Sequence, residues 1–261
     1  MTTGSLLWRG MIVGFLAALL SFGVLKTLGE PAVDRAIAFE SAMDEAKSKA
    51  VHDAAVSRGE TPPPVADEPE LVSRPVQGGI GLFTGVTVYS LAFGGLFALA
   101  FALCYGRIGD WSPRVASAVL ALSGFVAVYA VPTLKYPANP PSVGNPDTIG
   151  LRTAIYFAMM LLSLVSMIVA WNVRNGLAKR LGGWNATLVG GAIFLVAVIV
   201  AGVALPPLNE VPEGFPAVVL WQFRMASLGA QAVMWTALGL GFGAWVEHDY
   251  AQAKVGRLRT V

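Results

Sequence analysis

The chain is poor in the residues that carry most aqueous chemistry. Of its 261 residues, 13 % are charged, against about 25 % in soluble domains, while 55 % are hydrophobic. It has one cysteine, Cys104, and two histidines, His52 and His248. A single cysteine excludes an intramolecular disulfide and a cluster of thiolate metal ligands. A soluble fold of this length could not bury so much apolar surface, so the composition predicts a membrane protein.

The sequence also lacks the motifs of several common function classes. Its net charge of +2 is small and it has no long basic run, which argues against nucleic-acid binding. It contains no G-x-x-x-x-G-K-[ST] segment, so it has no P-loop for ATP hydrolysis. H-E-x-x-H is missing as well, and no nucleophile–base pair stands out. We therefore expect a protein that is not an enzyme.

Six apolar segments are each long enough, at about 20 residues or more, to cross the hydrocarbon layer of a bilayer as a helix. They span residues 6–28, 79–105, 115–134, 153–173, 186–205 and 225–246. None has an acidic residue in its middle, and Lys26 lies close enough to an end to reach the interface. The sequence therefore predicts an all-α, polytopic protein, with residues 1–261 forming a single integral membrane domain in the lipid bilayer.

Basic residues are distributed unevenly between the two sides of these segments. One side carries nine: Arg9, Arg107, Arg114, Arg174, Lys179, Arg180, Lys254, Arg257 and Arg259. Apart from the long first connection, the other side carries only Lys135, Arg152 and Arg224. Because Lys and Arg are retained in the cytoplasm, the pattern predicts six transmembrane helices with both termini cytoplasmic. A five-span alternative would disrupt this alternation.

The three connections on the opposite, outer side hold most of the distinctive polar sequence. The first, 29–78, is an acidic insert whose helix formers from 32 to 56 predict a helix, followed by a Pro-rich linker over 61–70. The second, 134–147, contains four prolines, which predict an extended path. The third, 208–216, has two carboxylates and no basic residue.

Acidic loops at the mouth of a helical bundle attract cations and offer oxygen ligands. The candidate metal ligands are Glu30, Asp34, Glu40, Asn139, Asp147, Glu210 and Glu213. His52 in the first connection is a further candidate for a transition metal. The alternative is that these carboxylates only fold the loops, by pairing with Arg35, Lys135, Arg152 and Arg224 at the helix ends.

Within the apolar segments, the sequence has none of the central Asp, Glu, Lys or His that mark proton relays. Gln231 is the polar side chain that would be most costly to expose to lipid, so we expect it to face the interior of the bundle. There it either holds helices together by hydrogen bonding or lines a pathway.

An internal repeat is a further prediction. An Arg and a Trp precede the third and fifth segments (107–111 and 180–184), and prolines follow both (132–137 and 207–212). The spacing predicts a duplicated helical hairpin, a known construction in transporters. The alternative is that both patterns are ordinary punctuation at the ends of spans.

Four sequence segments, taken in order, resemble the CbtA family, whose members are described as probable cobalt transporter subunits. They are residues 7–11 (LWRGM), 29–40 (GEPAVDRAIAFE), 134–150 (LKYPANPPSVGNPDTIG) and 209–216 (NEVPEGFP). The resemblance implies a multi-pass protein of the bacterial cytoplasmic membrane, with Co²⁺ as a transported ion, not a permanently bound cofactor, and a link to cobalamin synthesis. It also implies a small, single-span partner of the CbtB type that carries histidines. Family members often have a His-rich first outer connection, where this chain has only His52.

The leading interpretation is a subunit of an uptake transporter for a divalent transition-metal cation, cobalt first. The alternatives are a membrane scaffold that binds a partner through its acidic outer loop, and a permease for another small solute. A homo-oligomer is compatible with each. Transport predicts that the outer carboxylates converge over a crevice between helices, whereas a scaffold predicts that they are scattered or fully paired with basic residues.

Overall fold

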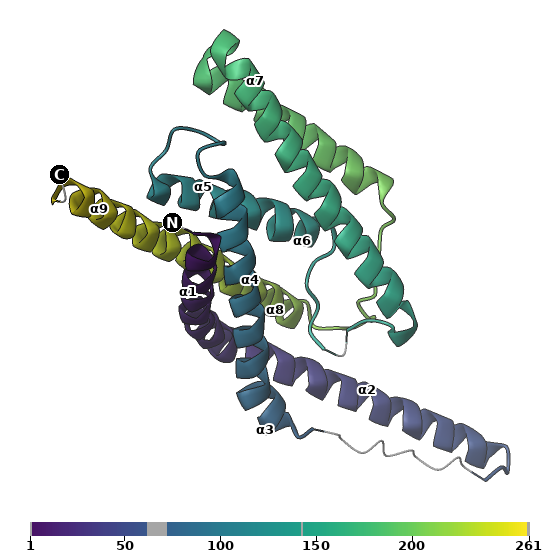
Figure 1. Cartoon of the computed structure of the whole chain (residues 1–261). Helices are drawn as coiled ribbons and strands as arrows, with labels where there is room; N and C mark the ends of the chain where they lie inside the picture. The colour runs from purple at the N-terminus through teal and green to yellow at the C-terminus, as the bar shows by residue number, and fades with distance from the viewer. Residues whose placement is uncertain (1, 62–71, 142, 260–261) are drawn as a thin grey trace.

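The structure is a computed structural model that describes residues 2–61, 72–141 and 143–259, and every regular element in these residues is helical (Figure 1). The α-helices are α1 (Thr3–Val24), α2 (Glu30–Ser57), α3 (Arg74–Val76), α4 (Leu82–Cys104), α5 (Pro113–Gly124), α6 (Val131–Lys135), α7 (Ile149–Ala204), α8 (Ala217–Ala237) and α9 (Gly243–Arg259). The π-helical segments are η1 (Leu25–Gly29), η2 (Gln77–Gly81), η3 (Phe125–Ala130) and η5 (Leu238–Phe242), and η4 (Pro146–Thr148) is a 3-10 turn. The all-α prediction is confirmed.

The π-helical segments join neighbouring α-helices end to end. The joined elements include five helices that are long and apolar enough to cross a membrane: Thr3–Ser57, Arg74–Cys104, Pro113–Lys135, Pro146–Ala204 and Ala217–Ala253. The fourth contains two of the six predicted apolar segments, 153–173 and 186–205, so the number of long helices and the number of apolar segments differ by this one element.

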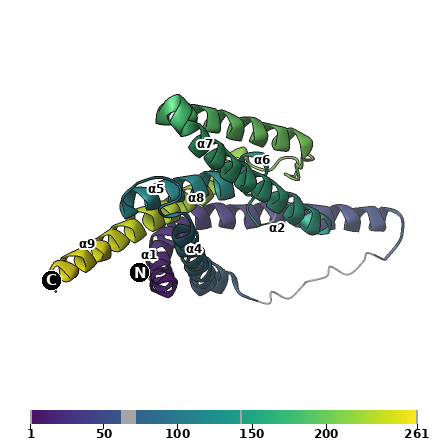
Figure 2. The same cartoon turned by 45° about the horizontal axis from the view of Figure 1, so that its top comes forward.

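Helix α7 folds back on itself at Gly182, whose backbone (φ 77°, ψ 159°) lies outside the helical region and favours glycine. The two arms pack closely, because a Cβ atom added to Gly190 would lie 2.9 Å from the carbonyl oxygen of Ala170. Figures 1 and 2 show this hairpin standing apart from α1 and α4. It is held to the rest of the chain through α6 and η3, where Tyr136, Ile155 and Met159 form a small apolar core.

The main core lies between α1, α4, α5, α8 and η5. Helices α1 and α4 approach backbone to backbone, because a Cβ atom on Gly94 would overlap the carbonyl oxygen of Gly10. Around this contact, the rings of Phe97 and Phe101 each meet Phe242 edge to face, with centroids 5.6 and 5.2 Å apart. Small residues therefore bring the helices together, and aromatic rings fill the space beside them.

Helix α2 continues α1 through η1 and projects away from the bundle (Figures 1 and 2). Its base packs through Ala32 and Ala36 against Phe215 and Val219, while the side chains of residues 41–54 are all exposed. The predicted helix over 32–56 is confirmed. The acidic, Pro-rich linker predicted to follow it falls mostly on residues 62–71, which lie outside the described residues.

The second outer connection has no regular helix in its described residues between Lys135 and Pro146, as its prolines predict. At the opposite end of the bundle, the guanidinium of Arg9 lies over the rings of Trp8 and Trp245 and pairs with Asp249 at 2.6 Å. The predicted repeat of helical hairpins stays a prediction.

The close approach of α1 and α4 gives a first prediction. Gly94→Leu should push the two helices apart and cost about 1–3 kcal/mol of folding free energy, the usual range for overpacking. The measurement is the midpoint of thermal unfolding of the purified protein in detergent. Gly85→Leu, on the same helix with open space around its Cβ position, is the matched control. Equal midpoints for the two variants would contradict the backbone-to-backbone contact.

Candidate functional site

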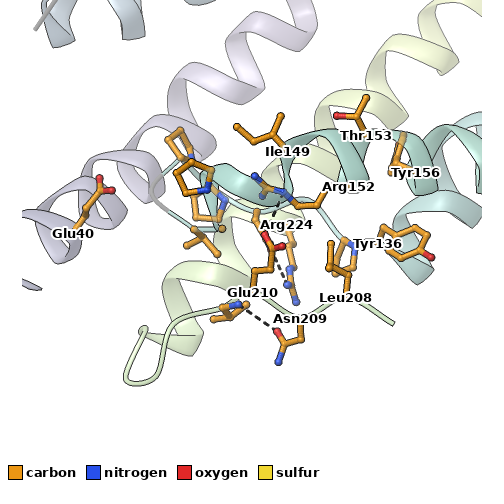
Figure 3. Close-up of a pocket in the computed structure, with 18 of the residues that line it drawn as sticks. Glu40, Tyr136, Ile149, Arg152, Thr153, Tyr156, Leu208, Asn209, Glu210 and Arg224 are labelled. Atoms are coloured by element: carbon orange, nitrogen blue, oxygen red, sulfur yellow. Dashed lines mark hydrogen bonds and ion pairs between the residues drawn. The ribbon is translucent and has the colours of Figure 1, made fainter. Parts of the chain in front are cut away.

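A cavity of about 790 Å³ opens among the second and third outer connections, the first two turns of α7, Arg224 of α8 and Glu40 of α2. We call it the loop cavity. Its polar lining includes Glu40 from α2, Asn139 from the second outer connection, Glu210 from the third, Arg152 from α7 and Arg224 from α8. Figure 3 shows Arg152, Arg224 and Glu210 close together, with Glu40 at one side. Segments far apart in sequence thus place charged groups of both signs around one opening.

The Pro-rich connection forms one wall of this cavity and is fixed by few contacts. The buried ring of Tyr136 starts it, and its hydroxyl donates a hydrogen bond to the carbonyl oxygen of Pro206 at 2.8 Å. Asn145 ends it, because its side-chain oxygen accepts from the N–H of Asp147 at 2.9 Å and caps η4. Between them, Gly144 has a φ of 131°, which favours glycine. A Cβ atom on residue 144 would also overlap the guanidinium of Arg152.

Glu210 is the most strongly held carboxylate in the cavity. It accepts a hydrogen bond from the Thr148 hydroxyl and another from the N–H of Asn145 at 3.1 Å, and it lies 3.2 Å from Nε of Arg152. The Thr148 hydrogen bond is the main reason that the pKa of Glu210 is lowered, and Asn145 and Arg152 add to it against the opposing effect of desolvation. Glu210 is therefore ionised at neutral pH and joins three segments.

Arg224 is held differently, by neutral oxygens. Its guanidinium donates to the side-chain oxygen of Asn139 at 3.0 Å and to the carbonyl oxygen of Ala138 at 3.2 Å. Glu40 lines the cavity from an exposed position on α2. The charges of Arg152 and Arg224 thus balance those of Glu40 and Glu210 around the loop cavity.

Two other predicted ligands, Glu30 and Asp34, lie in a separate cluster at the base of α2. Arg74 pairs with them at 2.8 and 2.9 Å, respectively. Beside them, Nζ of Lys26 donates to the carbonyl oxygen of Gly78 at 2.8 Å, and any Cβ atom on Gly78 would overlap the Glu30 carboxylate. Arg74 was not among the predicted partners. The sequence feature that could have identified Arg74 is its position as a basic residue near the end of the acidic first connection.

The remaining candidates do not line the loop cavity. Asp147, Glu213 and His52 have exposed side chains. Of the predicted charge partners, Arg35 donates to the carbonyl oxygen of Pro31 at 2.8 Å, and Nζ of Lys135 lies 5.7 Å from the ring centre of Tyr136.

The seven predicted ligands therefore divide into three at the loop cavity, two at Arg74 and two on exposed loops. In the part of the chain that the structure describes, no three His, Cys, Asp or Glu side chains form a group that could hold a metal ion. Any metal bound at the loop cavity would need amide, carbonyl or water oxygens beside its carboxylates. The ligand assignment stays a prediction.

Comparison with known proteins identifies the family. The family model of CbtA, described as a probable cobalt transporter subunit, matches residues 3–247. The chain belongs to the CbtA family. Membership and the five long apolar helices identify a membrane protein of the cobalt-transport type, and the word subunit implies a partner. A search of curated proteins and a search of solved structures found no match.

The contacts of Glu210 give a second prediction for this CbtA protein. Since its pKa is lower in the folded state, the stability that it contributes is present above its ordinary value of 4.5 and is lost as pH falls through the lowered value. Glu210→Gln should lower the midpoint of thermal unfolding at pH 7, and the difference from wild type should shrink as pH falls below about 4.5.

Glu213→Gln is the control, because this exposed carboxylate lies in the same connection. Glu213→Gln should leave the midpoint of thermal unfolding unchanged, both at pH 7 and below about pH 4.5. A wild-type minus Glu210→Gln difference that is independent of pH would contradict the role of the ionised carboxylate.

Proposed function

We propose that this CbtA protein is the membrane subunit of an uptake system for a divalent transition-metal cation, with cobalt as the first candidate, and that the cation enters at the loop cavity. One observation carries the proposal. Glu40, Asn139 and Glu210 come from three separate connections and meet around one opening at the end of a helical bundle. The family description supports cobalt as the cation, which oxygen ligands alone would not select.

The proposed topology has six spans, with both termini in the cytoplasm of a bacterium. A straight α7 of 56 residues would be about 84 Å long, almost three times the thickness of the hydrocarbon layer. Its fold at Gly182 instead gives two arms that each suit one crossing. Basic residues before α5 and at the Gly182 turn favour the cytoplasm for that side, which leaves the loop cavity facing outward.

To bind at the loop cavity, a cation must replace the arginines as the partner of Glu210 and Asn139. Arg152 already neutralises Glu210, and Arg224 already occupies the side-chain oxygen of Asn139. A divalent cation carries twice the charge of a guanidinium and can bind several oxygens at once, so it competes for both groups. Before a cation arrives, the two arginines keep the loop cavity folded and charge-balanced.

The family description of a subunit supports a partner. We propose a small, single-span partner of the CbtB type whose histidines supply nitrogen ligands for the metal, and a role in supplying cobalt for cobalamin synthesis. Nitrogen ligands would complement this chain, which has only two histidines.

One set of contacts favours the alternative of a scaffold. Glu30, Asp34 and Glu210 are each paired with an arginine, and α2 projects as an exposed arm of the kind that binds a partner. A scaffold needs these carboxylates only for folding. Transport needs Glu40 and Glu210 for the passage of the cation as well.

The third prediction separates the two. In bacteria without their other cobalt importers, the chain with its partner should take up radiolabelled Co²⁺. The double variant Glu40→Gln/Glu210→Gln should lower uptake at low Co²⁺ by about tenfold or more, a loss that even indirect perturbation of metal ligands produces.

Glu45→Gln is the matched control, since Glu45 is exposed on the same helix as Glu40 but does not line the loop cavity. All variants are compared at equal amounts in the membrane. Unchanged uptake by the double variant would rule out cation entry at the loop cavity. Absence of uptake by verified wild-type protein would favour the scaffold.

A further inference from the structure

Four polar side chains form a continuous set beneath the loop cavity, and we call them the inner cluster: Tyr89, Tyr129, Tyr156 and Gln231. Tyr156 on α7 lines the cavity itself. Tyr129 lies on η3, which packs against both α7 and α8. Tyr89 on α4 accepts a hydrogen bond from the side-chain nitrogen of Gln231 on α8 at 3.3 Å. The set thus leads from the cavity wall to the interface of α4 and α8.

The inner cluster lies within the proposed hydrocarbon layer. Tyr129 and Tyr156 are each about two helical turns, roughly 10 Å, from the outer end of their helical segments. Gln231 lies at a similar distance beyond Arg224, which is at the cavity. Three helical segments therefore place polar groups at one depth below the proposed entry site, and the hydrogen bond between Gln231 and Tyr89 adds α4 as a fourth.

One oxygen of the inner cluster lacks a partner. The side-chain oxygen of Gln231 is buried and makes no hydrogen bond to any described residue, whereas the buried hydroxyl of Tyr129 has the side chain of Thr133 beside it. An unpaired polar atom is costly in a layer where water and other partners are scarce. Polar side chains that only held helices together would be expected to satisfy one another. The free oxygen of Gln231 instead points to a ligand.

The backbone around Tyr129 is also irregular. Residues Phe125–Ala130 form a π-helix, and Pro132 directly after them removes one backbone donor. Such π-helical turns inside longer helices are frequent at functional sites. The same segment is where the α7 hairpin is attached to the rest of the chain. Tyr129 therefore lies on the segment that links the α7 hairpin to the main core.

We propose that the inner cluster is a second binding site, inside the membrane, for the same divalent cation, which passes to it from the loop cavity with part of its water shell. This inference rests on the proposed function. Neutral hydroxyl and amide oxygens hold a cation less tightly than carboxylates do, which suits a site that must release its ion. Aromatic rings flank the cluster, since Tyr89 packs on Phe93 and Tyr129 on Phe125, and their faces attract cations as well.

The fourth prediction tests whether water and cations reach the inner cluster from outside. Cys104 is the only cysteine, so a Cys104→Ser background is free of thiols. In that background, Tyr129→Cys and Gln231→Cys should react with a membrane-impermeant thiol reagent added outside, and Co²⁺ should slow the reaction. The expected rate is at least about tenfold above that of two controls, because thiolates form far less readily away from water.

Leu162→Cys places the thiol on an exposed apolar face of α7. Phe97→Cys opens a comparable hole in the main core, where Phe97 is 5 % exposed, away from the inner cluster. Equally slow reaction of all four variants would overturn the proposal. Fast reaction of Phe97→Cys would do the same, because the holes themselves would then admit water.

Uptake kinetics give a second readout. Tyr129→Phe and Gln231→Leu should lower the maximal rate of Co²⁺ uptake several-fold with little change in KM, whereas the loop-cavity variants should raise KM. Tyr250→Phe, an exposed tyrosine on α9, is the control. Full maximal rates in both inner-cluster variants, with uptake still dependent on Glu210, would overturn the second site and leave the proposed function standing.

A wild-type protein that takes up no Co²⁺ would contradict the proposed function by itself. If Co²⁺ also failed to slow labelling at positions 129 and 231, the proposed second site would be contradicted as well. Slower labelling without uptake would support the site and contradict the uptake role alone.

Discussion

Satisfaction of backbone hydrogen bonds is the constraint on which this structure depends. In hydrocarbon, every N–H and C=O group needs a partner within the chain, and a continuous helix supplies one for each. The apolar segments are therefore helical, and even their irregular parts, η3 and η5, keep i→i+5 bonding. Extended backbone is confined to the connections, so the Pro-rich segment and the third outer connection meet at one end of the bundle. The position of the loop cavity follows from this separation.

Charged side chains at both ends of the bundle are also paired, as the backbone groups are. Arg9 pairs with Asp249 at one end, while Arg152 pairs with Glu210 and Arg74 with Glu30 at the other. Each pair joins segments that are distant in sequence, so removal of one partner leaves a partly buried charge uncompensated. At the loop cavity, this arrangement has a second consequence. A cation that binds Glu210 must replace Arg152, and the displaced guanidinium must then find water or another acceptor.

The helices were predictable because apolar length and composition determine them locally. The same holds for the helical insert over 32–56 and the extended second connection. The turn within α7 was predicted less well. The predicted apolar segments ended at residue 173 and began again at residue 186, so the continuation of helix from both sides up to Gly182 was not predicted. Arg74 was missed because the ion pairs with Glu30 and Asp34 close a long connection, and nothing local specifies such closure. Of the inner cluster, the sequence analysis singled out only Gln231, because the tyrosines are single polar residues in separate apolar helices.

The distribution of carboxylates restricts how a cation could cross this protein. An acidic side chain at the centre of a span is costly in the membrane, and none of the six apolar segments has one there. Carboxylates can therefore concentrate a cation only outside the hydrocarbon layer, as Glu40 and Glu210 do at the loop cavity. Beyond that point, the proposed inner cluster offers neutral oxygens, and its member Tyr156 also lines the loop cavity. A gradient from charged to neutral ligands would weaken binding along the path, so the membrane potential, negative inside, or ligands from a partner would have to draw the ion onward.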